Sequence, residues 1–375
     1  MRYTFTTVLI LLFSYSIHAQ GFIKNYLNSI LKDTVSEEKA KLSIYPTVAF
    51  SPETSFELGF STIYVYKAKQ RKENRLSEIN SFTFYTLRNQ YGLFLNHALY
   101  TDHNDWFFLG ELKFKSFPLK YFGIGPDSPN KSLATINGND LFLKERVLKK
   151  ITKSYYTGLE IGFQSLTNIS IEDNNIETFE STDNIVGIDG STNLSLGWGF
   201  IHDDIHNILN AREGFYSEWA FLHSNKAWGS DYSFTNFFID NRLFKPINER
   251  NVLAMQLFSK IGIGDVPFNQ LALIGGEFLM RGYYLGRFRD KALLASQIEY
   301  RMLPFSFSKR WGGTVFLSTG GVGPTIGDLS LSNFKLAGGA GLRFLLYPKK
   351  DVYTRLDVAF TEQGAGVYVL IGEAF

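Results

Sequence analysis

Alternation of polar and apolar residues dominates this chain. From residue 43 onward, about sixteen segments of roughly 9 to 13 residues alternate in this way or are rich in β-branched and aromatic residues, with turn-forming pieces between them. Such alternation indicates strands with one polar and one apolar face, so the chain is expected to be all-β. The predicted strands are 43–51, 54–67, 77–87, 91–101, 105–115, 141–152, 155–167, 191–201, 214–224, 231–244, 250–262, 291–303, 313–321, 335–347, 352–361 and 365–375.

The apolar faces of these strands distinguish two all-β architectures. In the strand 291–303, for example, Leu294 and Ile298 lie opposite Glu299 and Arg301, and no predicted helix covers either face. A secreted soluble sandwich would hide its apolar face against a second sheet. A transmembrane barrel turns that face to lipid and its polar face to the lumen. The pattern favours a transmembrane antiparallel barrel of about sixteen strands over 43–375, with the soluble sandwich as the alternative.

The connections between the predicted strands differ at the two ends. The long connections are 116–140, 168–190, 263–290 and 322–334, and each follows an odd-numbered strand. Those after even-numbered strands are mostly short, as at 347–352. Short periplasmic turns and long outer loops are typical of bacterial outer-membrane barrels. Outer-membrane lipid is therefore an expected partner, and the outer membrane is the expected location.

The first 42 residues precede the predicted barrel. Arg2, the apolar run 8–13 and the small-residue end at 17–19 predict a secretory signal peptide over residues 1–19. Residues 20–42 form a short periplasmic segment with five apolar residues at helical spacing, namely Phe22, Tyr26, Leu27, Ile30 and Leu31. An amphipathic helix at the membrane interface or in the lumen fits this spacing, and a leader ordered only by the membrane is the alternative.

Charge and composition narrow the classes of function. A formal net charge of +2 gives no electrostatic surface for nucleic acid, so no nucleic-acid partner is expected. No later window approaches the roughly 18 to 20 uninterrupted apolar residues of a transmembrane helix. The chain has no cysteine, so no structural disulfide contributes to the fold.

One segment between predicted strands has neither alternation nor a helical period. It reads IGGEFLMRGYYLGRFRD, residues 274–290, and precedes a strand that ends Glu299-Tyr300-Arg301. It resembles the sixth-loop motif of the bacterial surface antigen, or Omp-eighty-five (Omp85), superfamily of sixteen-stranded barrels, which contains BamA, TamA and the two-partner-secretion transporters. The residues that carry this resemblance are Gly275, Gly276, Arg281, Gly282 and Tyr283.

Three other segments carry the same resemblance. GWGFIHDDIHNILNAREG at 197–214 is similar to the family's Asp-containing hairpin before the ninth strand. Residues 339–343 with 355–357 are similar to its last-strands pattern, and YFGIG at 121–125 to part of its third loop. The resemblance covers about residues 43–375.

The resemblance implies that loop 6 folds back into the lumen, where its arginine rests on polar residues of the wall. Alternation by itself places four charged residues on the lumen face: Glu299, Arg301, Arg343 and Asp357. Burying a guanidinium is unfavourable unless it is paired, so Glu299 and Asp357 are the expected partners of Arg281. The family often has an aspartate where Ser318 stands, and this chain departs from the pattern there.

The first and last predicted strands meet at a seam. Pro46 cannot donate a ladder hydrogen bond and suits a strand edge or a strand start, while Gly364 and Gly366 open the last strand. Phe375 provides the aromatic end that is the usual recognition signal of outer-membrane barrels. In the family, a weakly joined seam is the lateral gate through which insertases pass clients. The alternative is that Pro46 lies too near the strand start to matter.

The cluster 202–206, His-Asp-Asp-Ile-His, is the most enzyme-like feature. Such residues can activate water or bind a metal. Its place in the family hairpin favours a turn instead, with Asn207 and Asn210 bonding backbone groups. No catalytic residue, metal or cofactor is therefore expected, and the chain is not expected to be an enzyme.

The expected function follows from the resemblance. Family members that assemble or secrete proteins carry periplasmic POTRA domains, and the short segment 20–42 is too small to hold one. The chain is expected to move or insert a protein or lipid substrate with a separate periplasmic partner. The alternative is a passive or structural barrel, homo-oligomeric and without insertase activity.

Overall fold

A computed structural model describes residues 41–173, 185–205, 207, 210–348 and 351–375. The predicted signal peptide and all but the last two residues of the predicted segment 20–42 lie outside this described part. Within it, no helix is long and apolar enough to cross a membrane.

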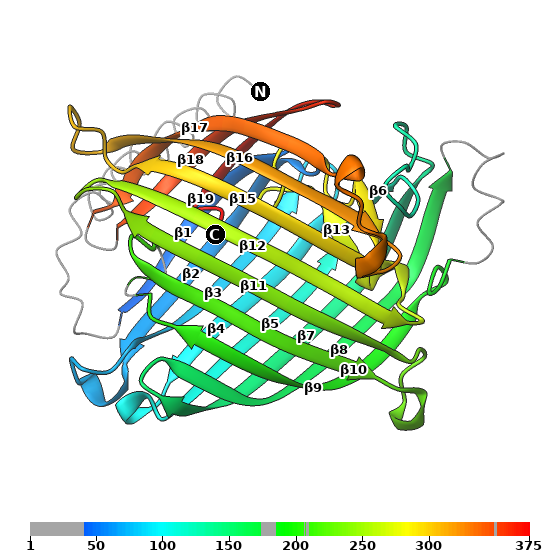
Figure 1. Ribbon diagram of the computed structural model, residues 1–375, viewed down its shortest axis with the longest axis horizontal. Coiled ribbons are helices and arrows are strands. Elements are labelled where there is room, and N and C mark those ends of the chain that lie inside the picture. Colours follow the sequence, from blue (N-terminus) through cyan, green and yellow to red (C-terminus); the bar gives the residue numbers. More distant parts are fainter. Residues whose placement is uncertain (1–40, 174–184, 206, 208–209, 349–350) are drawn as a thin grey trace, which may run out of the picture.

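Sixteen antiparallel strands form one closed barrel, in which each strand pairs with its neighbours along the chain and β1 pairs with β19 (Figure 1). The strands are β1 (Lys41–Ser51), β2 (Ser55–Lys67), β3 (Leu76–Thr86), β4 (Tyr91–Tyr100), β5 (Trp106–Ser116), β7 (Ala134–Thr152), β8 (Tyr155–Asp173), β9 (Ser191–Asp203), β10 (Gly214–Ser224), β11 (Phe234–Pro246), β12 (Asn251–Gly264), β15 (Ala292–Met302), β16 (Trp311–Gly323), β17 (Lys335–Tyr347), β18 (Val352–Thr361) and β19 (Gly364–Ile371).

Three short strands are present besides the sixteen in the described part of the chain. Beyond the end of β5, β6 (Leu119–Tyr121) continues the pairing with β7. The other two, β13 (Ala272–Ile274) and β14 (Phe288–Asp290), form a separate two-stranded ribbon between β12 and β15. This ribbon brings the two ends of the predicted sixth loop together.

The predicted all-β class and strand number are confirmed, and three strand ends differ from the prediction by four residues or more. One strand, β7, begins at Ala134, inside the connection predicted at 116–140, and β8 extends to Asp173. Backbone pairing between the two continues there, although the alternation of residues 134–137 is lost at 138–140 and the register shifts between Asn137 and Asn139. The last strand ends at Ile371 rather than at residue 375, because Gly372 adopts a φ of 91° that extended backbone does not use.

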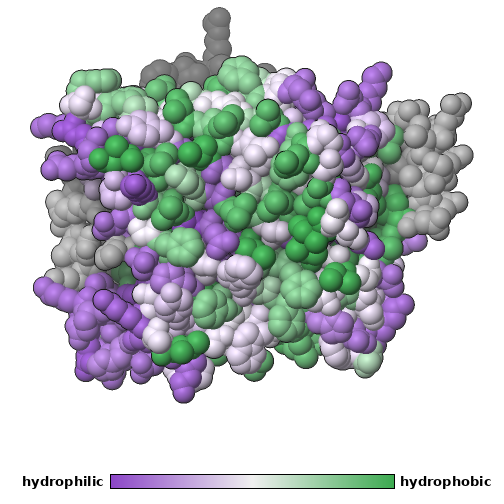
Figure 2. Space-filling view, in the orientation of Figure 1, coloured by the Kyte–Doolittle hydropathy of each residue, from purple (hydrophilic) through white to green (hydrophobic). Residues whose placement is uncertain are grey.

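The two faces of the wall differ as the alternation predicts. Apolar side chains such as Leu58, Trp219 and Leu317 are exposed on the outer face. Hydrophobic residues gather over the middle of the face shown in Figure 2, with hydrophilic residues at its two ends. On β15, Glu299 and Arg301 are fully buried on the opposite face. A lipid-facing apolar band around a polar interior is the arrangement of a transmembrane barrel.

Barrel closure is uneven around the circumference. Strand β1 pairs with β2 along its whole length, from Lys41↔Val65 to Ser51↔Ser55. It pairs with β19 through a single register pair, Phe50↔Val369. Pro46, which has no N–H to donate, lies in the stretch of β1 that β19 leaves unpaired. We call this β1–β19 boundary the seam.

Candidate functional site

The candidate site centres on residues 275–287, which connect β13 to β14 and are called loop 6 below. Its glycines occur where the backbone requires them. Gly275 has a φ of 111°, and a Cβ there would lie 2.1 Å from the carbonyl oxygen of Tyr284. Gly282 has a φ of 106°, and its Cβ would lie 2.6 Å from Cγ2 of Thr361 on β18. The glycines thus permit a tight turn and a close approach to the wall. Gly276, with a φ of 95°, serves the same turn.

Arg281 carries the main contact between loop 6 and the wall. Its side chain is 1% exposed. Nη1 donates to Oδ2 of Asp357 at 2.6 Å, Nη2 contacts Glu299, and the guanidinium lies 3.7 Å from the ring centroid of Phe316. The loop arginine therefore joins β15, β16 and β18 from the polar face of the wall. A buried guanidinium needs such pairing to offset its lost hydration.

The two carboxylates extend this contact into an ion-pair network. Arg301 Nε donates to Glu299 at 2.7 Å, and Arg343 Nη1 donates to Asp357 at 2.5 Å. Arg343 also pairs with Glu373, beyond the end of β19, at 2.9 Å. One network thus links loop 6, three strands of the wall and the residues that follow the seam strand. Arg355, part of the segment 355–357 that resembles the family's last-strands pattern, contributes a further 3.1 Å bond to Asp357 that was not predicted.

Ser318 lies outside this network. It is buried on β16, and its hydroxyl donates to the carbonyl oxygen of Ala337 at 3.3 Å. Arg281 pairs with Glu299 and Asp357 instead of a residue at position 318. The family aspartate that Ser318 replaces is therefore not needed to pair the loop arginine in this chain. Placement of the whole of loop 6 in the lumen goes beyond these contacts and stays a prediction.

Loop 6 is hydrogen-bonded to both sides of the seam. On the β19 side, the backbone N–H of Gly282 donates to the hydroxyl of Tyr368 at 2.9 Å. On the β1 side, the N–H of Leu285 donates to Oε1 of Glu53, in the β1–β2 turn, at 2.7 Å. Glu53 is 2% exposed, and this burial raises its pKa. Two backbone groups of one loop thus bridge the boundary that the strands themselves join at a single register pair.

Sequence reasoning missed both bridging side chains, for different reasons. Tyr368 occupies an inward position of the last strand, so alternation offered a signal for it. Glu53 occupies a short turn, where neither alternation nor a motif marks a residue. Tyr283 of the predicted motif contacts β17 instead, where its hydroxyl donates to the carbonyl oxygen of Leu336 at 3.2 Å.

The remaining predicted seam residues lie in the first part of β19 and beyond its end. Gly364, with a φ of 129°, begins the strand, and a Cβ on Gly366 would lie 2.8 Å from the Tyr368 hydroxyl. Phe375 was predicted to end the last strand, and this is wrong, because the strand ends four residues earlier. Its ring lies 6.2 Å from that of Phe244 on β11, with the Arg301 guanidinium 4.9 Å from its centroid. Residues after Gly372 therefore pack across the barrel instead of beside β1.

The outer half of loop 6 contacts the connection between β6 and β7. Arg287 Nη1 donates to the Ser128 hydroxyl at 2.8 Å, and Nη2 donates to Oδ1 of Asn130 at 2.9 Å. The N–H of Gly125, in the YFGIG stretch, donates to the carbonyl oxygen of Arg289 at 2.8 Å. The two segments singled out as resembling a third and a sixth loop are therefore direct neighbours.

The cluster at 202–206 lies at a turn, with His206 outside the described residues. Asp203 ends β9 and accepts a hydrogen bond from Arg75 Nη2 at 2.7 Å, and Asp204 accepts one from the N–H of Phe215. His202 lies against the ring of Tyr155, 4.3 Å between centroids. In the described part of the chain, no three His, Asp or Glu side chains converge as metal ligands would. The acidic residues join strands at this end of the barrel.

Comparison with known proteins agrees with this architecture. A closed sixteen-stranded antiparallel barrel with an apolar outer band and a charged interior is a transmembrane barrel of the bacterial outer membrane. Residues 42–346 match the model of the Omp85 superfamily domain. The chain belongs to the Omp85 superfamily.

Solved structures share this fold at low sequence identity. BamA from Haemophilus ducreyi lacking POTRA domains 1-3 superposes with a TM-score of 0.58 at 13% identity, over 89% of this chain and 70% of that one. CdiB from Acinetobacter baumannii gives 0.55 at 9%, over 89% and 65%. CdiB from Escherichia coli gives 0.56 at 9%, over 92% and 69%. At these identities the likeness concerns the fold.

Proposed function

We propose that this barrel moves or inserts a protein or lipid substrate at the outer membrane by opening at the seam, together with a separate periplasmic partner. The observation that carries the proposal is the single register pair Phe50↔Val369 between β1 and β19. A backbone hydrogen bond contributes about 1 kcal/mol net. A boundary with so few of them is therefore the place where a closed barrel separates at least cost.

Loop 6 would control that opening. In this proposal it lies in the lumen, anchored by Arg281 to Glu299 and Asp357, while its bonds to Tyr368 and Glu53 hold the two sides of the seam together. Separation of the strands breaks at least one of the two bridging bonds. Opening is thereby coupled to loop 6, and no catalytic step is assigned to any residue.

A reversible lock at the seam tests this function. The chain has no cysteine, so Phe50→Cys with Val369→Cys places one disulfide-forming pair at the closing register pair. We call this double substitution the seam variant. Its oxidised form is expected to fail to complement the detergent sensitivity of a deletion strain, and reductant is expected to restore complementation. A matched pair, Leu143→Cys with Phe163→Cys at register partners on β7 and β8, should complement in both redox states. Full complementation by the oxidised seam variant would contradict the proposal.

Crosslinking in intact envelopes distinguishes the alternative, a passive or structural barrel that forms homo-oligomers. The proposed function predicts a stoichiometric periplasmic protein in the crosslinked product. Self-crosslinks alone would favour the structural barrel.

A further inference from the structure

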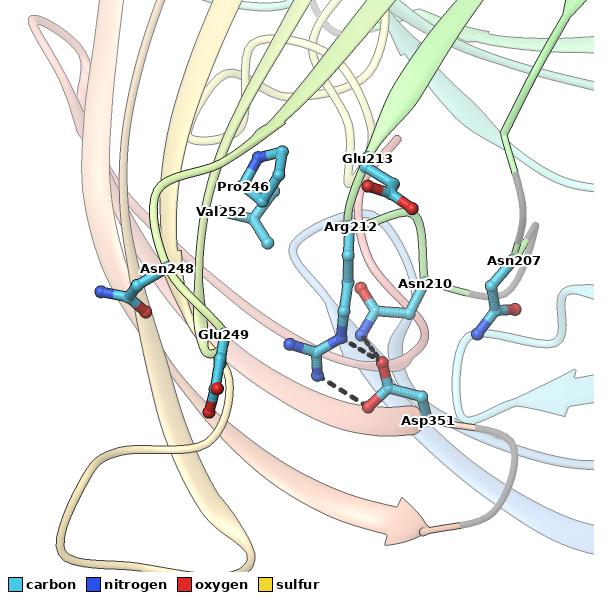
Figure 3. A pocket seen from close by; sticks show the side chains of 9 residues that line it. All are labelled: Asn207, Asn210, Arg212, Glu213, Pro246, Asn248, Glu249, Val252 and Asp351. Atoms are coloured by element: carbon cyan, nitrogen blue, oxygen red, sulfur yellow. Dashed lines mark hydrogen bonds and ion pairs between the residues drawn. The ribbon is translucent and has the colours of Figure 1, made fainter.

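A cavity of about 340 Å³ lies at the end of the barrel where β1 begins, the end assigned to the periplasm. Three turns line it: those between β9 and β10, between β11 and β12, and between β17 and β18 (Figure 3). The β9–β10 turn contacts the β17–β18 turn, although these strand pairs are not neighbours in the sheet. Asn210 Nδ2 donates to Asp351 Oδ2 at 3.0 Å. The cavity is thus built from contacts between distant turns.

Arg212, the basic side chain that lines the cavity, is already paired with a carboxylate. Arg212 Nε and Nη2 donate to the two carboxylate oxygens of Asp351 at 2.5 and 2.8 Å, and Nη1 donates to the carbonyl oxygen of Leu303 at 2.8 Å. The bond to Asp351 is the main cause of a raised pKa at Arg212, so the guanidinium stays charged and paired. An anionic ligand would have to compete with this bidentate pair, so the cavity does not suit an anion.

Hydrogen-bond acceptors, in contrast, remain unused. Asn210 is 3% exposed, and its buried Oδ1 has no hydrogen-bond partner among the residues that the structure describes. In Figure 3 this side chain points into the space between the turns. Leaving a buried acceptor unsatisfied costs about 1–3 kcal/mol, so a ligand that donates a hydrogen bond here recovers that cost. Glu213 and Glu249 line the same cavity, are exposed, and take part in no ion pair within the described part of the chain.

The rest of the lining is apolar. Val252, 1% exposed, and Pro246 form one side of the cavity. An apolar side, a buried acceptor and two carboxylates together match a side chain with an apolar stem and a charged, donor-rich head. Arginine and lysine have that form. A metal ion fits less well, because no three His, Asp or Glu side chains of the described residues are grouped as metal ligands would be.

We propose that this cavity receives an arginine or lysine side chain of a polypeptide that docks on the periplasmic mouth of the barrel. The assignment to the periplasm rests on the proposed function, whereas the binding chemistry rests on the acceptor of Asn210, the carboxylates of Glu213 and Glu249, and the apolar side of the cavity. The partner is thereby defined as a protein with a basic side chain at its docking surface.

Peptide binding to the purified full chain in detergent micelles tests the proposal. The probe is a fluorescein-labelled Gly-Arg-Gly peptide followed by fluorescence polarisation, and its comparison is the same peptide with citrulline, a neutral analogue of arginine of similar size. Arginine is expected to bind about tenfold or more tightly than citrulline, since charge-assisted hydrogen bonds are lost with the charge. Equal affinities would overturn the proposal.

Variants of the two exposed carboxylates place the binding site. Glu213→Gln with Glu249→Gln should weaken binding of the arginine peptide about tenfold without unfolding the barrel, because neither side chain is ion-paired within the described residues. Glu73→Gln with Glu172→Gln removes the same charge from exposed positions elsewhere and should leave binding unchanged. Equal weakening in both double variants would overturn the site.

Two further outcomes distinguish the docking proposal from binding of the chain's own N-terminal segment and from seam opening. If the peptide binds only after deletion of residues 20–40, the chain's own leader fills the cavity and the docking proposal fails. The seam variant should bind the peptide equally well in its oxidised and reduced forms. Retained binding together with full complementation by the oxidised form would contradict seam opening and leave the docking site standing.

Discussion

The β7–β8 boundary and the seam are both antiparallel strand pairs of one barrel, yet they are held together differently. Strands β7 and β8 are each 19 residues long and pair from Ala134↔Asp173 to Thr152↔Tyr155. The seam has the single register pair Phe50↔Val369. The first boundary is closed by its own backbone ladder. The second depends on a loop that lies across it, so side chains of that loop control its stability.

The buried charges follow the same division. Arg146 on β7 pairs with Glu160 on β8 at 2.5 Å and with Glu218 on β10 at 2.9 Å. All three residues belong to strands of the barrel wall. Arg281 belongs to a loop and pairs with Glu299 and Asp357 of the wall. The chemistry is similar, but only the second network can release a segment of chain when it breaks.

Loss of Arg281 should have the largest effect. Arg281→Ala leaves Glu299 and Asp357 without their loop partner, and breaking a buried pair costs about 3–5 kcal/mol. We expect lower resistance to urea unfolding and higher conductance in planar bilayers, because loop 6 loses its anchor. Arg146→Ala is the matched control, since it removes an equally buried arginine of the wall and should destabilise the barrel without raising conductance. Similar conductance increases in both variants would remove the distinction between the two networks.

Loss of Glu53 should have an intermediate effect at the seam. Glu53→Ala removes the acceptor of the Leu285 N–H, at a cost of about 1–3 kcal/mol for an unsatisfied buried group. The rate of disulfide formation in the seam variant measures how freely the seam moves, and it should change when Glu53→Ala is added. Disulfide formation by the matched cysteine pair on β7 and β8 should stay as it is. A change at both boundaries would indicate general loosening instead.

Acidity should stabilise the folded protein through Glu53, because burial disfavours its charged form more than the hydrogen bond from Leu285 favours that form. Burial raises the pKa of Glu53 above its ordinary value of 4.5, so folding favours its protonated form. Its contribution to stability is therefore fully present below pH 4.5 and is lost as pH rises through the raised folded-state pKa. Glu53→Gln keeps an acceptor for Leu285 without a charge. The stability difference between this variant and the wild type, from urea titrations, should grow in favour of the variant between about pH 4 and pH 7, and a constant difference would contradict this account.

Ser318 should matter least. Ser318→Ala removes one 3.3 Å hydrogen bond to Ala337 and no contact of Arg281, so a loss of about 1 kcal/mol or less is expected in urea unfolding. Conductance should stay at the wild-type level. A conductance increase like that of Arg281→Ala would show that position 318 supports loop 6 after all.

The sequence by itself determined the strands, their faces and the special character of loop 6. Period-two alternation follows from the strand backbone and from the contrast between lipid and lumen, so it identified the sixteen strands and placed Glu299 and Asp357 on one face. The glycines of loop 6 marked a segment whose backbone fits neither a helix nor a strand. These are local consequences of residue type and spacing.

Only the tertiary structure decided how the barrel is closed. The single register pair at the seam, the bonds of loop 6 to Tyr368 and Glu53, and the inward packing of Phe375 join residues far apart in the chain. Leu285 and Glu53, for example, are separated by 232 positions. Alternation fixes the direction of each side chain but gives no information on which distant backbone group it meets. These long-range contacts depend on closure of the whole barrel. The cavity at Asn210 also depends on a contact of this kind, between Asn210 and Asp351.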